Sequence, residues 1–367
     1  MTYNPIQLES LLGREPIVIN PEFIHALHED LKGKTILITG AAGSIGSEIV
    51  RQVARFNPGR LLLCDVAETP LYTLGLEMDE MFPAIPVELI ICDVRNVFRM
   101  EKIFKKYSPQ HVYHAAAYKH VPMMEAHPSE AALMNVFGTK NIVDLSVRYQ
   151  VQVFVMISTD KAVNPVNVMG ASKRIAEIYV QSLHEKLQDT SIIGTRIITT
   201  RFGNVLGSNG SVISRFEEQI RKGGPVTVTH PDIIRYFMTI PEACRLVLEA
   251  ANMGKGGEIF VFDMGEPVKI VDLAQNVIRL SGYTPGRDVK IVFTGLRPGE
   301  KLYEEMMFDD EQMQSTCNRK IRMAYIRPYN HEEVSAELCS LYKYATEMED
   351  AQVVKQMKRM VPEFVHE

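Results

Sequence analysis

The sequence predicts an α/β fold in which helices cover both faces of a mostly parallel, doubly wound sheet. From Lys34 onward, short apolar runs bounded by glycine alternate with amphipathic stretches, a rhythm typical of β-α-β units. The apolar runs have the length and composition of buried strands and cover residues 35–39, 61–65, 87–91, 111–114, 151–157 and 193–200. Helical patterns separate them over residues 44–56, 94–106, 130–149 and 167–187.

Length and composition set the domain number and exclude some partners. The chain has 367 residues, 46% of them hydrophobic, and a formal net charge of -5, so it can bury a large core and shows no basic excess for nucleic acid. Because single cores stop growing near about 250–300 residues, we expect one large domain and a smaller region. The expected divisions are an N-terminal segment over 1–33, the main sheet domain over 34–200, a smaller glycine- and proline-rich region over 201–325 whose strand near 258–262 can rejoin the sheet, and C-terminal helices over 326–367.

Other features of composition bear on where the protein works. No apolar run reaches the roughly 18 residues that cross a bilayer, and the first 21 residues lack the apolar core of a signal peptide. The five cysteines are scattered and show neither a CxxC pair nor a disulfide-like spacing. We therefore expect a cytoplasmic protein with reduced thiols, no metal site and no membrane span in this chain.

A glycine-rich turn follows the first predicted strand and opens the first predicted helix. It reads Gly40-Ala41-Ala42-Gly43-Ser44-Ile45-Gly46. Glycine lets such a turn close and lets backbone N–H groups approach a pyrophosphate, while the helix dipole favours its negative charge. Strand, turn and helix in this order predict a Rossmann-type dinucleotide-binding domain.

An acidic residue supports the same prediction and indicates which dinucleotide binds. Asp65 ends the next strand, 19 residues after Gly46, where a carboxylate can accept both ribose hydroxyls of NAD. Val66-Ala67 follows where an enzyme that binds a 2′-phosphate often carries arginine or lysine, so the sequence favours NAD over NADP. Asp93-Val94 ends the third predicted strand and could reach the adenine ring, although a helix-capping role for this aspartate is equally compatible with the sequence.

The predicted chemistry lies beyond the fifth strand. Ligands of open α/β sheets bind outside the carboxyl ends of the strands, which is where Ser158-Thr159-Asp160-Lys161 falls. Neighbouring aspartate and lysine can also form a plain solvated turn. The next predicted helix, however, carries Met169 and Lys173 four residues apart and therefore on one face.

The order of these motifs resembles that of extended short-chain dehydrogenases acting on nucleotide sugars. The resemblance rests on the glycine-rich turn, Ala115-Ala116-Ala117, Asn135, Ser158-Thr159-Asp160-Lys161 and Met169-x-x-x-Lys173. Three runs resemble, more narrowly, the CapD-like polysaccharide-biosynthesis branch: Ala117-Tyr118-Lys119-His120-Val121-Pro122, Thr159-Asp160-Lys161-Ala162-Val163-Asn164-Pro165 and Arg201-Phe202-Gly203-Asn204-Val205. That branch contains the UDP-N-acetylglucosamine 4,6-dehydratases, and the similar segment covers residues 10–325.

The resemblance implies a role for each motif residue. It implies tightly bound NAD, regenerated in each turnover, and a UDP-sugar substrate. Lys173 matches the lysine that hydrogen-bonds the nicotinamide ribose, and Thr159 matches the residue that contacts the sugar C4 hydroxyl. Asp160 matches the acid that protonates the departing C6 hydroxyl, and Lys161 matches the base that removes the C5 proton. We expect Lys161 to lose its own proton readily, because Lys173 and oxidised nicotinamide place positive charge nearby. The implied cofactor contacts are Gly40, Gly43, Ser44, Ile45, Gly46, Asp65, Asp93, Val94, Ala115, Ala116, Ala117, Asn135 and Lys173.

Met169 departs from the common pattern of the resembled family. Most members place there the tyrosine that takes the C4 hydroxyl proton, and a thioether cannot do so. A subgroup of large membrane-anchored dehydratases that retain the C5 configuration has methionine at this position. The resemblance therefore implies the product UDP-2-acetamido-2,6-dideoxy-α-D-xylo-hexos-4-ulose. It leaves two candidates for the C4 base, namely Thr159 with an ordered water, or Asp160.

Several later residues resemble positions that hold the UDP moiety. They are Asn204, Arg215, Arg235, Arg297 and Glu300. The planar guanidinium of arginine suits a diphosphate, although a surface salt bridge is the alternative for each. Lys119 either faces the cleft or is structural.

Some questions stay open at the level of sequence. Residues 11–16 resemble the segment that joins a membrane portion to the catalytic domain in large relatives, so a cytoplasmic fragment and a stand-alone form are both compatible with the chain. We expect a homo-oligomer. A nucleotide-sugar 4-epimerase is the nearest alternative function, and a non-catalytic NAD-binding scaffold is a further one. An epimerase needs no acid–base pair at C5 and C6, so Asp160-Lys161 favours the dehydratase.

Overall fold

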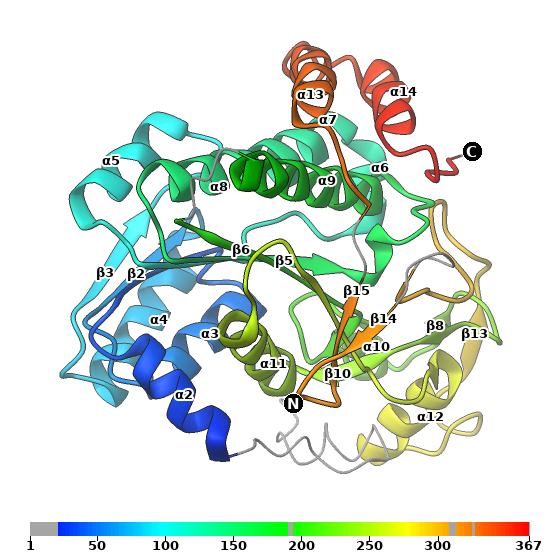
Figure 1. Cartoon of the computed structure of the whole chain (residues 1–367). Helices are drawn as coiled ribbons and strands as arrows, with labels where there is room; N and C mark the ends of the chain where they lie inside the picture. The colour runs from blue at the N-terminus through cyan, green and yellow to red at the C-terminus, as the bar shows by residue number, and fades with distance from the viewer. Residues whose placement is uncertain (1–20, 190–193, 308–312, 325–326, 367) are drawn as a thin grey trace.

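A large parallel sheet forms the centre of the protein. The computed structural model describes residues 21–189, 194–307, 313–324 and 327–366. Within these residues a nine-stranded sheet has the order β14-β15-β11-β6-β5-β4-β1-β2-β3 (Figure 1). Its strands are β1 Thr35–Thr39, β2 Arg60–Asp65, β3 Val87–Ile91, β4 His111–His114, β5 Val153–Thr159, β6 Arg196–Phe202, β11 Ile259–Phe262, β14 Met313–Ser315 and β15 Ile321–Ala324. All neighbours pair in parallel except β15, which runs antiparallel to both β11 and β14.

Consecutive apolar residues, whose side chains point to opposite faces of the sheet, explain why this sheet is covered on both faces. Leu37 of β1 packs into one core, whereas its neighbours Ile36 and Ile38 pack into the other. A strand buried on both faces is typical of parallel sheets, because the crossover helices lie on each side. The predicted α/β fold with a doubly wound sheet is therefore confirmed.

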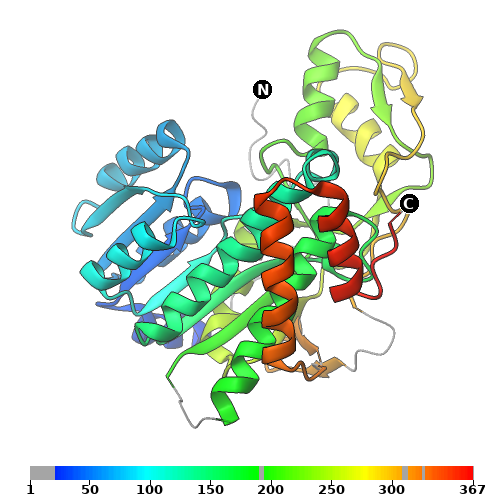
Figure 2. The ribbon, with the colours of Figure 1, turned by 90° about the horizontal axis from the view of Figure 1, so that it is seen from above.

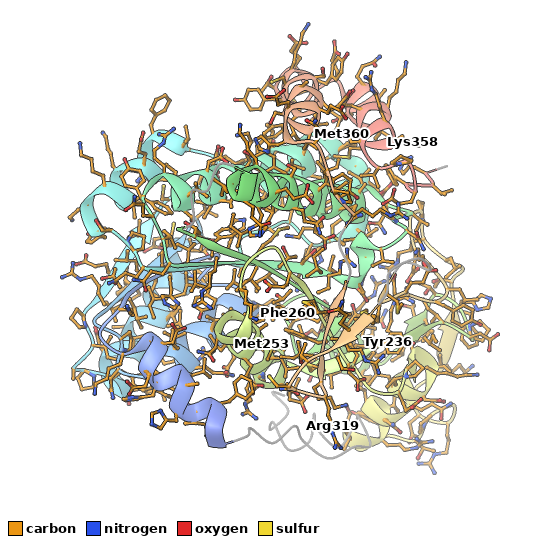
Figure 3. The ribbon with its side chains drawn as sticks, in the orientation of Figure 1. Tyr236, Met253, Phe260, Arg319, Lys358 and Met360 are labelled. Atoms are coloured by element: carbon orange, nitrogen blue, oxygen red, sulfur yellow. The ribbon has the colours of Figure 1, made fainter. Side chains whose placement is uncertain are left out.

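Two sets of helices form the outer layers, above and below the sheet in Figure 1. One face carries α5 Val97–Tyr107, α8 Thr139–Arg148 and α9 Val168–Asp189, and the other carries α2 Pro21–Leu31, α3 Ser44–Ala54, α4 Glu68–Met81 and α11 Ile240–Met253. Phe260 of β11 and Met253 at the end of α11 lie in the lower core (Figure 3). The C-terminal helices α13 His331–Thr346 and α14 Asp350–Met360 pack on the outside of α9.

A small lobe stands beside the sheet, as Figure 2 shows. It consists of α10 Val212–Arg221, β8 Val226–Val228, α12 Ile270–Leu280 and β13 Ile291–Phe293. The lobe has its own apolar core, which includes Phe216 and Val277. Residues 201–325 thus contribute to both bodies, because β11, β14 and β15 lie in the main sheet.

The fifth strand has its predicted length but lies two residues further along the chain, over Val153–Thr159 instead of 151–157. Its predicted end is residue 157, yet β5 continues through Ser158 and Thr159, which pair with Arg201 and Phe202 of β6. The pattern missed this extension because both added residues are polar. Conversely β6 begins at Arg196, and residue 193 of its prediction lies outside the described residues.

A buried ion network fixes α9 against the end of β5. The Glu177 carboxylate accepts hydrogen bonds from Arg201 Nε at 2.9 Å and Ser158 Oγ at 2.6 Å. A third donor, Arg174 Nη1, lies 3.2 Å from the same carboxylate. Burial opposes the charge of Glu177, but the two arginines outweigh burial and lower its pKa to about 2. The network thus joins the helix to two central strands at one point.

No helix in the described ranges combines the length and apolar character needed to cross a bilayer. In the same ranges no group of three or more histidine, cysteine, aspartate or glutamate side chains is placed to hold a metal ion.

Glu177→Gln should lower the free energy of unfolding by about 3–5 kcal/mol, because Arg201 then stays buried without its counter-charge. Urea unfolding followed by circular dichroism measures this change. Replacing both partners, Glu177 by Leu and Arg201 by Met, should recover part of the loss. A single-variant loss below about 1 kcal/mol, as at an exposed pair, would contradict the structural role of the network.

Candidate active site

The predicted motifs meet at one edge of the sheet. Strands β2 and β3 lie on one side of β1, and β4, β5 and β6 lie on the other, so the strand order reverses between β1 and β4. Ligands of doubly wound sheets bind in the crevice outside the carboxyl ends of the strands at such a reversal. The glycine-rich turn follows β1, the alanine run follows β4, and the Thr159–Lys161 segment ends β5.

Glycine permits two close backbone contacts in the turn. Gly40 has a φ of +66°, and a Cβ there would lie 2.6 Å from the backbone nitrogen of Ala116. A Cβ on Gly46 would overlap the carbonyl oxygen of Gly40. The turn therefore lies directly against the loop after β4. Gly43 begins α3 without a side-chain cap, which leaves the first helical N–H groups open to an anion.

Asp65 holds the turn in place from the end of β2. Its Oδ2 accepts the N–H of Ala42 at 2.9 Å, and its Oδ1 accepts the N–H of Ala67 at 2.9 Å. Each carboxylate oxygen has a second lone pair, so these bonds leave acceptors for ribose hydroxyls. The expected neighbourhood of Asp65 and the glycine-rich turn is thus what the structure shows.

Asp93 and Val94 both contact other parts of the protein. Arg95 Nη2 lies 2.7 Å from Asp93 Oδ2, and Arg95 also binds Glu130. The helix-capping alternative is not seen either, because Asn96 caps α5. The Val94 side chain is buried in the apolar core. Contact of this pair with adenine stays a prediction.

Asn135 is buried and hydrogen-bonds both the loop after β4 and α9. It belongs to a π-helical turn, η1 Ala132–Gly138, and is fully buried. Its Oδ1 accepts the Tyr118 N–H at 2.8 Å, and its Nδ2 donates to Ser172 Oγ at 2.9 Å. Asn135 thereby joins the loop after β4 to the helix that carries Lys173.

An acid–base cluster occupies the end of β5 and the following 3-10 turn, η2 Asp160–Ala162. Thr159 Oγ1 donates to Asp160 Oδ1 at 2.8 Å, and Lys161 Nζ donates to the same oxygen at 3.0 Å. Asp160 Oδ2 is buried and has no hydrogen-bond partner within the described chain. It faces Gly203, where a Cβ would lie only 3.0 Å away. Asp160 therefore keeps one acceptor for a ligand.

The first turns of α9 complete the cluster. A Cβ on Gly170 would overlap the Lys161 carbonyl oxygen, so glycine lets α9 lie on that backbone. Met169 is 4% exposed and packs in the apolar core, which suits no acid–base role. Lys173 is also 4% exposed, and its ammonium has no hydrogen-bond partner in the described ranges. Burial lowers the pKa of Lys173 to about 8, against the opposing effect of Glu177.

Lys161 differs from its expected charge state. Burial opposes its charge, but the carboxylates of Asp160 and Glu304 outweigh burial and raise the pKa of Lys161. The expectation that nearby positive charge favours the neutral amine is therefore not met in this structure. Glu304 was missed because no motif surrounds it. An adjacent acidic pair, Glu304-Glu305, is the one signal in the sequence around it.

The predicted substrate residues fall into two groups. Asn204 and Arg235 lie in the cluster: Asn204 Oδ1 accepts from Lys161 Nζ at 3.2 Å, and Arg235 donates to the backbone oxygens of Ile234 and Lys301. Arg235 is thus bound by the protein's own backbone rather than presented to a diphosphate.

The second group lies at the surface. Arg215 on α10 and Arg297 are exposed and form no ion pair with other described residues. Their guanidinium groups are therefore accessible to an anion. Glu300 accepts from Thr229 Oγ1 at 3.2 Å and from the Arg297 N–H at 3.1 Å. Lys119 is exposed, with its Nζ 3.5 Å from Ser208 Oγ.

The cleft fits a dinucleotide on two observations. Side chains at Gly40 and Gly46 would collide with backbone, so the turn keeps its N–H groups accessible. The buried ammonium of Lys173, which has no hydrogen-bond partner among the described residues, suits two ribose hydroxyls.

The sheet topology and these strand-end motifs define a Rossmann-type protein of the extended short-chain dehydrogenase class. Residues 36–326 match the family described as polysaccharide biosynthesis protein, and the chain belongs to that family, in its CapD-like branch. The capsular polysaccharide biosynthesis protein CapD of Staphylococcus aureus is 50% identical over 330 residues, which cover 90% of this chain and 54% of CapD. EpsC of Bacillus subtilis is 51% identical over 83% of this chain and 50% of its own length. The chain spans about half the length of these two relatives.

Other relatives and solved structures agree with this fold. A UDP-glucose 4-epimerase of Rickettsia canadensis is 33% identical over 76% of this chain and 79% of its own length. Pen from Bacillus thuringiensis superposes with a TM-score of 0.74 at 33% identity, covering 82% of this chain and 89% of Pen. A dTDP-glucose 4,6-dehydratase of Streptomyces venezuelae, solved with NAD, has a TM-score of 0.63 at 20% identity, covers 74% of this chain and 88% of its own, and shares the fold.

Gly46→Ala should lower the free energy of unfolding by about 1–3 kcal/mol, because the added methyl group overlaps backbone that must move. Gly43→Ala is a matched control in the same turn: its Cβ would lie 3.2 Å from the Gly40 oxygen, and its φ of −75° suits any residue. Thermal and urea unfolding of both variants measure the difference. Equal losses would show that the close approach at Gly46 is unimportant.

Proposed function

We propose that this chain is an NAD-dependent UDP-N-acetylglucosamine 4,6-dehydratase (a lyase) that supplies UDP-2-acetamido-2,6-dideoxy-α-D-xylo-hexos-4-ulose for capsule, O-antigen or other glycan synthesis. The observation that carries the proposal is the hydrogen-bonded trio of Thr159, Asp160 and Lys161, in which Asp160 is buried. Family membership supports a nucleotide-sugar dehydratase or epimerase, and the acid–base trio favours the dehydratase.

NAD is the proposed cofactor, held by the glycine-rich turn, Asp65 and Lys173. When bound, NAD supplies the hydride acceptor for C4 and the hydride donor for C6. Lys173 would orient the nicotinamide ribose, and its buried charge would favour deprotonation of groups near it. The solved dehydratase with NAD supports this cofactor through its shared fold.

The Asp160 carboxylate is suited to accept a proton and then to deliver it. Its unpartnered Oδ2 can accept the C4 hydroxyl proton as that carbon is oxidised. The same oxygen can then deliver the proton to the C6 hydroxyl, which leaves as water. Thr159 donates to Oδ1 and so fixes the carboxylate orientation. Because Met169 carries no exchangeable proton, Asp160 is our preferred C4 base.

Lys161 is suited to move the second proton. As the neutral amine it would take the C5 proton, which the C4 ketone acidifies, while the C6 oxygen leaves. The resulting ammonium would return this proton to C5 on the same face, which gives retention of configuration. These steps balance, because the carbon-bound hydrogens are kept and the departing water consists of the C6 hydroxyl and the proton from the C4 hydroxyl.

The proposed contacts of the UDP moiety come from exposed arginines. The exposed Arg215 and Arg297 are suited to a diphosphate, because their guanidinium groups have no ion-pair partner among the described residues. Arg235 is better suited to hold residues 301–302 in place. A 4-epimerase is the second candidate, on the likeness to UDP-glucose 4-epimerases.

Incubation of the protein with NAD and UDP-N-acetylglucosamine in heavy water should give a product that has lost one water and carries deuterium at C5. Deuterium enters because the amine hydrogens of Lys161 are already exchanged for deuterium, so the ammonium that forms on taking the C5 proton can return a deuteron to C5. Mass spectrometry gives the composition, and proton couplings give the configuration at C5. An unchanged mass with a new isomer would identify an epimerase, and an L-arabino product would contradict retention while leaving dehydration intact.

Two variants test whether Asp160 and Lys161 carry out this turnover. Lys161→Met should abolish dehydration yet leave NAD binding nearly unchanged, and Asp160→Asn should be similarly damaging because an amide cannot deliver the proton. Lys102→Met, an exposed lysine on α5, is the control and should keep wild-type turnover. Wild-type turnover in Lys161→Met would remove this lysine from the mechanism.

NAD should bind at least tenfold more tightly than NADP, a difference of about 1.4 kcal/mol. A 2′-phosphate beside the Asp65 carboxylate would suffer like-charge repulsion, and Val66-Ala67 offers no cation to offset it. Calorimetric titration with each dinucleotide measures the preference, and Asp65→Asn should narrow it. Equal or tighter binding of NADP would overturn this role of Asp65.

A further inference from the structure

Two carboxylates, from segments far apart in the sequence, flank the ammonium of Lys161. Asp160 Oδ1 lies 3.0 Å from Lys161 Nζ, and Glu304 Oε1 lies 3.9 Å from it. The Glu304 side chain is 5% exposed and forms no hydrogen bond within the described chain. Its close polar contacts are ion pairs with Lys161 and with Arg235, whose Nε lies 3.6 Å away.

The charges that face this cluster are few. Lys161 is influenced by Asp160, Glu304 and Arg235, and Glu304 is influenced in addition by Lys301. Lys301 Nζ is bound 2.7 Å from Glu305, outside the cluster.

Arg235 makes its hydrogen bonds to groups other than Glu304. Its terminal nitrogens donate to the backbone oxygens of Ile234, Lys301 and Leu302. Glu304 therefore lies between two cations, of which only Lys161 is assigned a chemical step.

From this arrangement we infer that Glu304 is a positioning residue that acts through Lys161, by stabilising the ammonium that forms when Lys161 takes the C5 proton. The inference rests on the proposed function. A buried negative charge near the nitrogen strengthens the amine as a base, because charge stabilisation at low dielectric exceeds that in water. It also keeps the proton on Lys161 until the proton returns to C5.

The protonation behaviour of the cluster is consistent with this role. Burial and the nearby Asp160 raise the pKa of Glu304, against the effects of Lys161 and Arg235. The Asp160 and Glu304 charges together raise the pKa of Lys161 despite burial. Removing the Glu304 charge should therefore lower the pKa of Lys161. Activity that needs the neutral amine rises with pH through this pKa, so its acidic limb should move to lower pH.

The first test reads Lys161 directly and needs no turnover. Competitive acetylation with acetic anhydride over a pH series, followed by peptide mass spectrometry, reports the neutral fraction of this lysine. In Glu304→Gln the midpoint should fall by about one pH unit, which is a tenfold gain in neutral amine. Glu305→Gln is the matched control, because this exposed neighbour pairs with Lys301 instead, and it should label as wild type does.

The second test uses the dehydration rate. In Glu304→Gln the acidic limb of kcat/KM should move to lower pH by a similar amount while the plateau falls at least tenfold. Glu304→Asp keeps the charge and should restore most of the limb position. A purely structural role would lower the plateau without moving the limb.

Coincident midpoints in wild type and Glu304→Gln would overturn the inference even if dehydration is observed. If the wild-type protein forms no dehydrated product, the proposed function fails, and the acetylation series still decides whether Glu304 controls Lys161. Circular dichroism of each variant shows that the fold is kept, and Glu304→Ala removes the same charge if Glu304→Gln does not fold.

Discussion

The end of β5 is the constraint on which the candidate site depends. This strand lies between β4 and β6, and its last two residues, Ser158 and Thr159, still pair with β6. From α9 the buried Glu177 carboxylate binds both Ser158 and Arg201, so the strand end and the helix cannot slide past each other. Asp160 therefore projects from a backbone that is held from the sheet and from the helix. Such rigidity is what positioned acid–base groups require.

Close backbone contact brings the other parts of the cleft to this strand end. Gly40 lets the glycine-rich turn touch the loop after β4, and Gly170 lets α9 rest on the Lys161 carbonyl. Gly203 leaves room for the Asp160 carboxylate. At each position a methyl group would meet atoms that cannot all move. The cleft is thus shaped by missing side chains as much as by those present.

The sequence predicts the parts of this protein that arise from local pattern. The predicted limits of β1, β3 and β4 agree with the structure, because each strand is a short, mostly apolar run. The sequence also predicts the edge of the sheet at which the motifs meet, because the carboxyl ends of parallel strands lie at the same edge. The contact of Glu304 with Lys161 could not be predicted, because a segment beyond β13 brings it and no periodicity or motif marks it. The raised pKa of Lys161 could not be predicted for the same reason.

The two lysines of the site show how burial and partners separate their chemistry. Both are enclosed by protein, yet Lys173 has only the more distant Glu177 as counter-charge, and burial lowers its pKa to about 8. Lys161 contacts two carboxylates and has a raised pKa, although burial acts against it. A lysine without a close partner gains most from ligand hydroxyls, whereas a paired lysine can hold a proton and return it. Burial alone therefore does not separate these two lysines. Their carboxylate neighbours do, and the difference favours the proton transfer proposed for Lys161 and the ligand contact proposed for Lys173.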